Sequence, residues 1–224
     1  MAVQPRQGRR GHDPESVLAI AVDVFNERGY DGTSMEDLAR ALGVTKSAIY
    51  HHVAGKEQLL ALALDRALDG LSELVADERA GSGPAIERLE WVVRESVRIL
   101  VDRLPYVTLL LRVRGNSATE RRALERRRAF DAFVSHLVKE AAAEGAIRPD
   151  LDPVLVTRLL FGAVNSITEW YRPARGGSAE DLADTLVRMT FGGLRGGGNR
   201  VPVIAQLVQA DDGSGQGRRQ RRMT

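Results

Sequence analysis

The sequence lacks cysteine, and it has no apolar run long enough to cross a membrane. The absence of cysteine excludes disulfides, thiolate nucleophiles and cysteine-ligated metals, and it fits a cytoplasmic protein. No stretch approaches about 18 apolar residues without a charge, so we expect no membrane span. The basic segment at residues 1–12 is not followed by an apolar stretch, so we predict no secretory signal.

Enzyme motifs are also lacking. We find no Ser-His-Asp context and no paired carboxylates in an identifiable site. The glycine run at 196–198 follows no strand, so it is not a phosphate loop. His51 and His52 are adjacent and would point in different directions on a helix, while His12 and His136 are isolated. We therefore predict no catalytic residues, no cofactor and no metal.

What is present is a compact helical pattern at residues 33–60. Apolar residues recur at helical spacing over 35–42, and Gly43 follows where helices often end in a left-handed residue. Thr45 can then cap a second short helix over 46–51. A short helix, a glycine turn and a polar-tipped helix form the helix-turn-helix pattern, whose second helix enters the major groove of DNA.

A preceding helix is predicted over 14–28. Asp13 is a suitable cap, Phe25 belongs to its apolar stripe, and Gly29 ends it. Thr33 or Ser34 can cap the next helix, since acidic residues follow at capping-box spacing.

Together, residues 21–60 read AxxxFxxxGYxxTSMxxLAxxxGVxxxxxYxHVxxKxxLL. This order resembles the amino-terminal domain of TetR-family transcriptional regulators. It departs at Val53, where the family usually has Phe, and at Ala54, where a polar residue is common. The resemblance implies an all-α fold of about nine helices: an N-terminal three-helix helix-turn-helix DNA-binding domain and a C-terminal helical ligand-binding and dimerisation domain.

DNA contacts are expected mainly from the start of the second helix, since a helix entering a groove leads with its N-terminal residues. The Tyr50 hydroxyl can meet a phosphate, and Lys56 opens a helix whose N-terminus attracts phosphate. The predicted DNA-binding residues are Arg9, Arg10, Thr33, Ser34, Thr45, Lys46, Ser47, Tyr50, His51 and Lys56.

The charge balance opposes this interpretation. The ends, 1–12 and 213–224, carry seven arginines and no acid, so the net charge of +2 hides an acidic remainder. Residues 13–60 hold eight acids against four bases. DNA affinity would then depend on the arginines of residues 1–12 and on the positive N-termini of helices. An alternative is a helical ligand-binding or scaffolding protein that does not bind DNA.

The remaining chain predicts further helices and one turn. A helix from Lys56 to Asp77 links the two domains, and residues 78–85 are predicted as a turn. Helices follow over 84–103, 106–114, 117–143, 154–171 and 178–194. The charge-dense start of 117–143 predicts a solvated face with pairs such as Glu125–Arg128. The alternative is a second nucleic-acid patch.

A small-molecule pocket is predicted among the helices of 84–171, because bundles bind ligands between their helices. The predicted ligand-binding residues are Trp91, Tyr106, Leu110, Phe130, Phe133, Phe161, Asn165 and Trp170. The ending WYRP is similar to TetR-type regulators of fatty-acid, steroid or aromatic-acid catabolism, several of which sense acyl-CoA thioesters. That similarity makes Arg112, Arg114 and Arg158 candidates for the CoA phosphates. An enzyme built on the bundle would have only this cavity in its favour.

The resemblance also implies a homodimer through the last two helices, reading two half-sites about 34 Å apart. The predicted interface residues are Val164, Thr168, Leu182, Leu186 and Met189.

The expected plan is a flexible basic arm (1–12), a DNA-binding domain (13–60), a ligand-binding and dimerisation domain (61–193) and a flexible basic tail (194–224). We expect a repressor released from a palindromic double-stranded operator by a small-molecule effector.

Overall fold

The computed structural model describes residues 13–173 and 177–194, and every regular element within these ranges is a helix. The helices are α1 (Pro14–Arg28), α2 (Met35–Leu42), α3 (Lys46–Ile49), α4 (Lys56–Ala76), α5 (Glu78–Gly81), α6 (Ala85–Asp102), α7 (Leu104–Arg112), α8 (Ala118–Ala143), α9 (Pro153–Trp170) and α10 (Ala179–Leu194). The described part thus holds ten helices instead of about nine, because the predicted turn at 78–85 contains α5. None of these helices is long and apolar enough to cross a bilayer.

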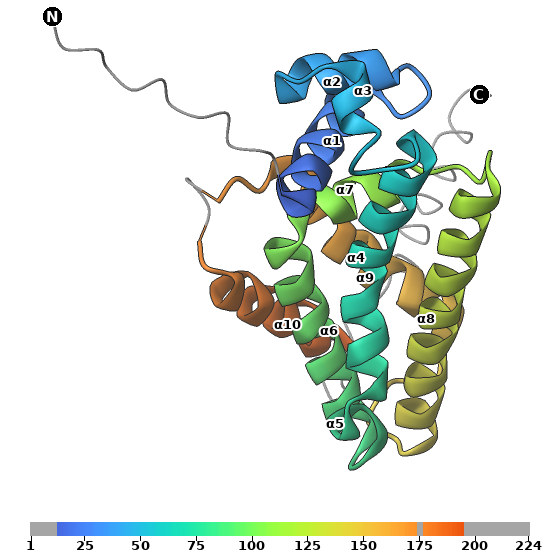
Figure 1. Cartoon of the computed structure of the whole chain (residues 1–224). Coiled ribbons are helices and arrows are strands. Elements are labelled where there is room, and N and C mark those ends of the chain that lie inside the picture. Colours follow the sequence, from blue (N-terminus) through green and yellow to red (C-terminus); the bar gives the residue numbers. More distant parts are fainter. Residues whose placement is uncertain (1–12, 174–176, 195–224) are drawn as a thin grey trace, which may run out of the picture.

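A small bundle of α1, α2, α3 and the start of α4 occupies one end of the molecule (Figure 1). Its core includes Phe25, Leu38, Ile49 and Leu59, all fully buried. Phe25 also meets Tyr30 edge to face, with ring centroids 5.2 Å apart. Helices as short as α2 and α3 are unstable alone, so this shared core holds them in place.

Side-chain caps set most boundaries of this bundle. Asp13 accepts the Ser16 amide at 2.8 Å, and Ser34 forms the reciprocal capping box with Asp37. Gly43 ends α2 with φ of 68°, a conformation that other residues adopt at a cost. The predicted helices over 14–28 and 35–42 are therefore confirmed.

The second helix of the motif is shorter than predicted. It ends at Ile49 instead of His51. His51 and His52 donate their amides to the carbonyls three residues back, which tightens the chain into a turn. Tyr50 is thus the C-terminal cap of α3.

The long helix α4 joins the small bundle to the body. Its 21 residues span about 30 Å, from the bundle to the short corner helix α5 (Figure 1). Its buried face, which includes Leu64 and Leu68, packs against α6, α7 and α8. The predicted linker helix is therefore confirmed.

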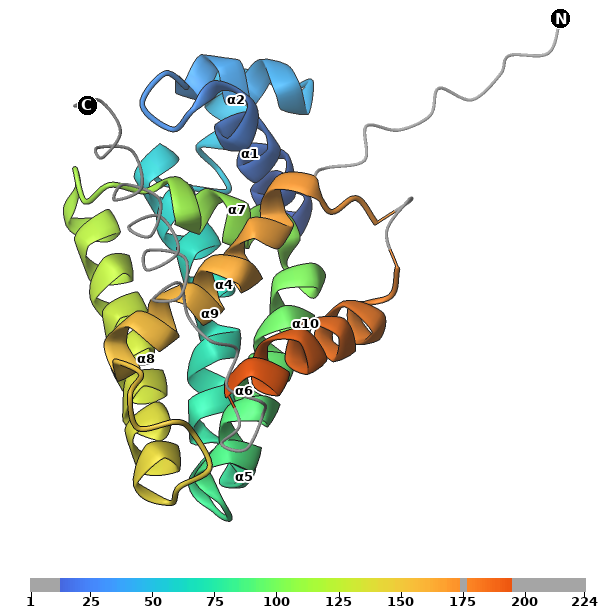
Figure 2. The same cartoon turned by 180° about the vertical axis from the view of Figure 1, so that it is seen from behind.

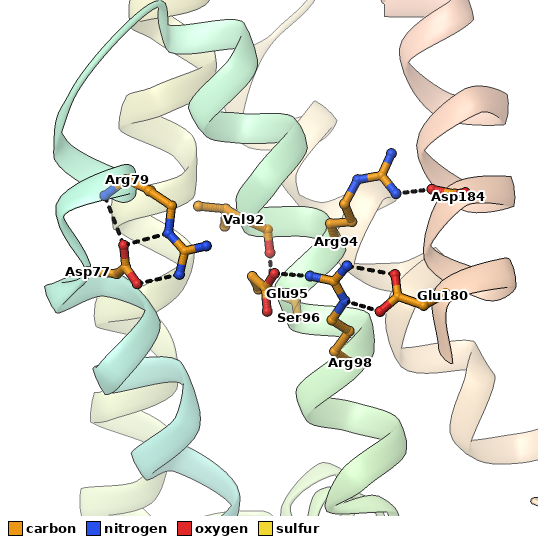
Figure 3. A network of polar contacts seen from close by, with 9 residues as sticks. All are labelled: Asp77, Arg79, Val92, Arg94, Glu95, Ser96, Arg98, Glu180 and Asp184. Atoms are coloured by element: carbon orange, nitrogen blue, oxygen red, sulfur yellow. Dashed lines mark hydrogen bonds and ion pairs between the residues drawn. The ribbon is translucent and has the colours of Figure 1, made fainter. Parts of the chain in front are cut away.

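The last two helices lie on one side of the body, where α9 runs diagonally and α10 packs on α6 (Figure 2). Arg94 pairs with Asp184, and Arg98 pairs with Glu180 at 2.6 Å (Figure 3). The carboxylates of both pairs are exposed to solvent, which screens the attraction, so the pairs contribute little to the attachment of α10. The apolar contacts of Phe191, which is 2% exposed, add to the attachment of α10.

The charge-dense start of α8 is not simply a solvated face. Glu120 is 4% exposed, and its carboxylate accepts the backbone amides of residues 114–116 at 2.7–3.0 Å. Arg126 pairs across to α4, with Asp65 at 2.9 Å and Asp69 at 2.7 Å. The predicted solvated face is confirmed for exposed residues such as Glu125 and Arg128. It was wrong for Glu120 and Arg126, because their partners come from a loop and from another helix.

Candidate nucleic-acid interface and ligand cavity

The exposed surface of α3 is polar and carries hydrogen-bond donors. Thr45, Lys46 and Ser47 at its start are exposed, and Tyr50 at its end is 47% exposed. The Thr45 and Ser47 hydroxyls lie 3.1 Å apart, and Lys46 forms no ion pair with any residue of the described ranges. His51 is exposed beside them. Hydroxyl and ammonium groups of this kind can bind phosphates and base edges.

Two of the predicted DNA-binding residues are used inside the bundle. Thr33 is only 1% exposed, and its hydroxyl donates to the Gly29 carbonyl at 2.7 Å. Ser34 is exposed, but its hydroxyl donates to Asp37 at 2.6 Å as part of the cap. A phosphate contact by Thr33 has no support in this geometry, because its donor is both buried and occupied.

Lys56 also serves the bundle. Its Nζ donates to the carbonyls of Thr33 at 3.0 Å and Tyr30 at 3.1 Å, and it lies 4.5 Å from the centre of the Tyr30 ring. The ammonium therefore closes the turn between α1 and α2. The predicted phosphate contact of Lys56 was based on its position at the start of a helix. The backbone carbonyls that it binds come from the turn between α1 and α2, which the sequence alone did not place beside it.

Several carboxylates of residues 13–60 have partners within the protein, but among the described residues only Glu15 pairs with a cation from outside this segment, Arg66. The engaged carboxylates are Asp13 with Ser16, Glu15 with Arg66, Asp37 with Arg28 and Arg40, and Glu57 with Thr119. The Ser34 hydrogen bonds lower the pKa of Asp37, and the two arginines lower it further. Arg9 and Arg10 lie outside the described residues.

A small cavity of about 50 Å³ lies inside the body, where α4, α6, α7, α8 and α9 meet. Four predicted ligand-binding residues line it: Leu110, Phe130, Phe161 and Asn165. Phe130 and Phe161 meet edge to face with centroids 5.2 Å apart. The walls are otherwise mostly aliphatic, which suits a hydrocarbon group.

The other four predicted ligand-binding residues lie elsewhere. Trp91 stacks on Arg79 at 4.7 Å, and Tyr106 lies 5.4 Å from Arg66. Phe133 lines a separate pocket between α4 and α8, and Trp170 is 56% exposed. Helical periodicity identified them as apolar, but it does not tell which neighbour each one meets.

A wider groove of about 730 Å³ runs between α8 and α9 and shares four lining residues with the cavity. The shared residues are Arg127, Asp131, Phe161 and Asn165. We call these four the neck. Within the neck, burial raises the pKa of Asp131, and Arg127 and Arg158 oppose that rise.

The groove is predominantly basic. Its charged lining comprises Arg127, Arg128, Lys139 and Arg158 against Asp131, and His136 also lines the groove. An apolar cavity that opens into a basic groove can hold a molecule with a hydrocarbon end and an anionic end.

Of the three predicted arginines, only Arg158 lines this groove. Arg112 binds the Asn26 carbonyl and Arg114 is exposed at the start of a loop. The sequence did not identify Arg127, Arg128 and Lys139 as groove residues. Their spacing places them along α8, but it indicates a shared groove only when α9 is known to lie beside them.

The outer face of α9 and α10 differs from the predicted dimer interface. Val164, Thr168 and Leu186 are buried within the protomer, and Leu182 packs against its core. Met189 is exposed, at 67%. The exposed apolar positions of α9 are instead Leu155, Leu159 and Trp170, with Val154 beside them. Of the predicted interface residues, only Met189 therefore faces outward, and the others face the core of the protomer.

No group of three His, Asp or Glu side chains suited to a metal ion exists within the described ranges.

Comparisons with known proteins agree with this architecture. Residues 17–63 match the family model of bacterial regulatory proteins of the tetR family, and residues 82–194 match that of the tetracyclin repressor-like C-terminal domain. A crystal structure of a TetR-family regulator from Streptomyces coelicolor is 58% identical, with a TM-score of 0.77, covering 82% of this chain and 93% of that chain.

Two further relatives are informative. AibR, crystallised with isovaleryl coenzyme A and operator DNA, is 30% identical with a TM-score of 0.66, covering 80% of this chain and 97% of its own. The transcriptional repressor KstR2 of Mycolicibacterium smegmatis is 26% identical over 80% of this chain and 89% of that protein. The helix-turn-helix, the helical body and both family models agree. The chain therefore belongs to the TetR family of transcriptional regulators.

Proposed function

We propose that this TetR-family protein is a dimeric repressor that leaves its operator when an acyl-CoA thioester binds in the cavity and groove. The observation that carries the proposal is the neck, where an apolar cavity opens into a basic groove. An acyl group fits the first and the CoA phosphates fit the second. AibR, which was crystallised with isovaleryl coenzyme A, supports this effector class.

DNA binding is assigned to residues 13–60, with Thr45, Lys46, Ser47, Tyr50 and His51 as the reading face. Arg9 and Arg10 would add phosphate or minor-groove contacts from the arm at 1–12. The exposed hydroxyls and ammonium at the start of α3 support this assignment.

The body, residues 61–193, is assigned to ligand binding and dimerisation. Leu155, Leu159 and Trp170 form an exposed apolar stripe on α9, and Met189 is a further exposed apolar side chain on α10. Covering such a face with its own copy gives the two-fold symmetry that a palindromic operator requires. The protein then acts in the cytoplasm, on DNA, without catalytic activity.

Release follows from the position of α7. Val107, Leu110 and Leu111 of this helix line the cavity. The same helix holds α1, because Asn26 donates to the Pro105 carbonyl at 2.8 Å and Arg112 donates to the Asn26 carbonyl. A ligand that favours a shifted α7 would therefore move α1, and the half-site spacing would change.

A mobility shift with the protein's own upstream DNA tests the proposal. Tyr50→Ala and Lys46→Ala should each weaken binding, whereas Arg158→Ser should leave binding intact but blunt release by an acyl-CoA. If both reading-face variants bind like the wild type, the assigned face is wrong. Absence of any salt-dependent DNA binding would favour a scaffolding role, since phosphate contacts lose affinity steeply with salt.

A further inference from the structure

The inner cavity is small for a sensor of hydrophobic molecules. Its volume is about 50 Å³. A site needs about 10–15 Å³ on this measure to admit one water, so the cavity admits on the order of four non-hydrogen atoms. A long acyl chain therefore does not fit behind the neck.

The deep end of the cavity offers no free polar group. Ser96 is its one polar residue away from the neck, and its hydroxyl donates to the Val92 carbonyl at 2.7 Å (Figure 3). The remaining deep wall includes Ala67 and Leu71 of α4 and Ile99 of α6. Whatever fills this end must be hydrocarbon, because a polar group there would lose its hydrogen bonds.

A second space lies directly behind part of this wall. The pocket between α4 and α8, of about 260 Å³, is lined by Leu68, Ser72, Val75 and others. It shares two residues with the inner cavity, Leu71 and Phe130. These two side chains form the partition between the two spaces.

We propose that the Leu71–Phe130 partition sets the acyl-chain length of the effector, so that the protein responds to short-chain CoA thioesters. This inference rests on the proposed function. The acyl group passes the neck, fills the small cavity and stops at the partition, while the CoA moiety stays in the basic groove. Longer chains leave methylenes in water or force the partition apart.

Leu71 is the better residue for a test. Phe130 is 6% exposed and packs on Phe161, so its removal would damage the core. Leu71 is only partly buried, and Leu71→Ala would join the cavity to the α4–α8 pocket. The matched control is Val75→Ala, which shortens a 36% exposed apolar side chain on the same helix that lines only the α4–α8 pocket.

The experiment is calorimetric titration of the full-length protein with straight-chain acyl-CoA thioesters from acetyl to palmitoyl, with free CoA as reference. For the wild type, affinity should rise about fourfold per methylene over the first few carbons and then stop rising. Leu71→Ala should bind octanoyl-CoA about tenfold more tightly than the wild type does, as about two further methylenes become buried. Val75→Ala should keep the wild-type profile, and thermal melts should show both variants folded.

Two results would overturn the partition alone: tighter wild-type binding of palmitoyl-CoA than of butyryl-CoA, or the same profile for Leu71→Ala as for the wild type. If folded wild-type protein binds no CoA thioester of any length, the effector class falls, and the partition falls with it.

Discussion

The two ends of the molecule differ in how completely their interiors are filled. In the small bundle, Phe25, Leu38, Ile49 and Leu59 are fully buried, and even Thr33 and Lys56 are bound within the fold. The body instead keeps a cavity, a basic groove and an exposed apolar face on α9.

This difference fits opposite tasks. A close-packed bundle holds its exposed donors in one geometry, which a reading surface needs. Side chains around a cavity lack contacts on one side, so the helices there can shift at a lower cost when a ligand fills the space. Both α4 and α7 touch the two regions, so these helices are where the close-packed part and the adaptable part meet.

The largest effect on stability should come from removing the buried Glu120 carboxylate, which binds the loop before α8. Glu120→Ala leaves the amides of residues 114–116 without their acceptor. We expect the free energy of unfolding to fall by about 3 kcal/mol, measured by urea denaturation. Glu120→Gln, which keeps an acceptor oxygen, should lose clearly less. Equal denaturation midpoints for the two variants would contradict this role.

The next test separates residues of the small bundle that contact DNA from residues that stabilise the fold. Lys46→Met should weaken operator binding and reduce the salt slope by about one, because one phosphate contact is lost. Lys56→Met should leave the slope unchanged but lower the free energy of unfolding by about 1–2 kcal/mol, because two backbone carbonyls lose their donor. Salt-dependent mobility shifts and urea denaturation measure the two quantities. A reduced slope for Lys56→Met would restore its predicted phosphate contact.

A smaller effect is expected at the junction of the two regions. Asn26→Ala removes the hydrogen bond to the Pro105 carbonyl. The factor by which an acyl-CoA weakens operator binding should fall by about threefold, with little change in binding without ligand. Asn116→Ala, an exposed loop position, is the control. If both variants respond to ligand like the wild type, the signal does not pass through this contact.

The smallest effect concerns pH at the far end of the body. The Arg79 side chain and amide lower the pKa of Asp77 from 3.8 to about 2. Since the folded pKa is the lower one, the stabilisation is fully present above the unfolded value and is lost as the pH falls toward 2. Asp77→Asn should therefore flatten the loss of stability in this window, as followed by urea unfolding at several pH values. DNA binding at neutral pH should not change, and an unaltered acid slope would argue against the pair.

Most helix boundaries could be predicted because their causes are local. Ser117 and Asp152 accept amides within the next three residues, just as Asp13 does. The failures share another origin: Glu120, Lys56 and Arg126 find partners in other elements. The candidate sites differ for the same reason. The DNA-reading residues from Thr45 to Tyr50 could be predicted because they lie in one short segment. The cavity lining could not be predicted completely, because its residues come from five helices.

By itself, the order of residues 21–60 determined the helix-turn-helix and the family, because caps, turns and apolar spacing act over a few residues. Only the tertiary structure decided that Arg127 and Arg158 share a groove, that Leu71 and Phe130 divide two spaces, and that Leu155 faces outward while Val164 faces inward. Helical periodicity reports that a side of a helix is apolar, but the neighbour that covers it is set by how distant segments pack.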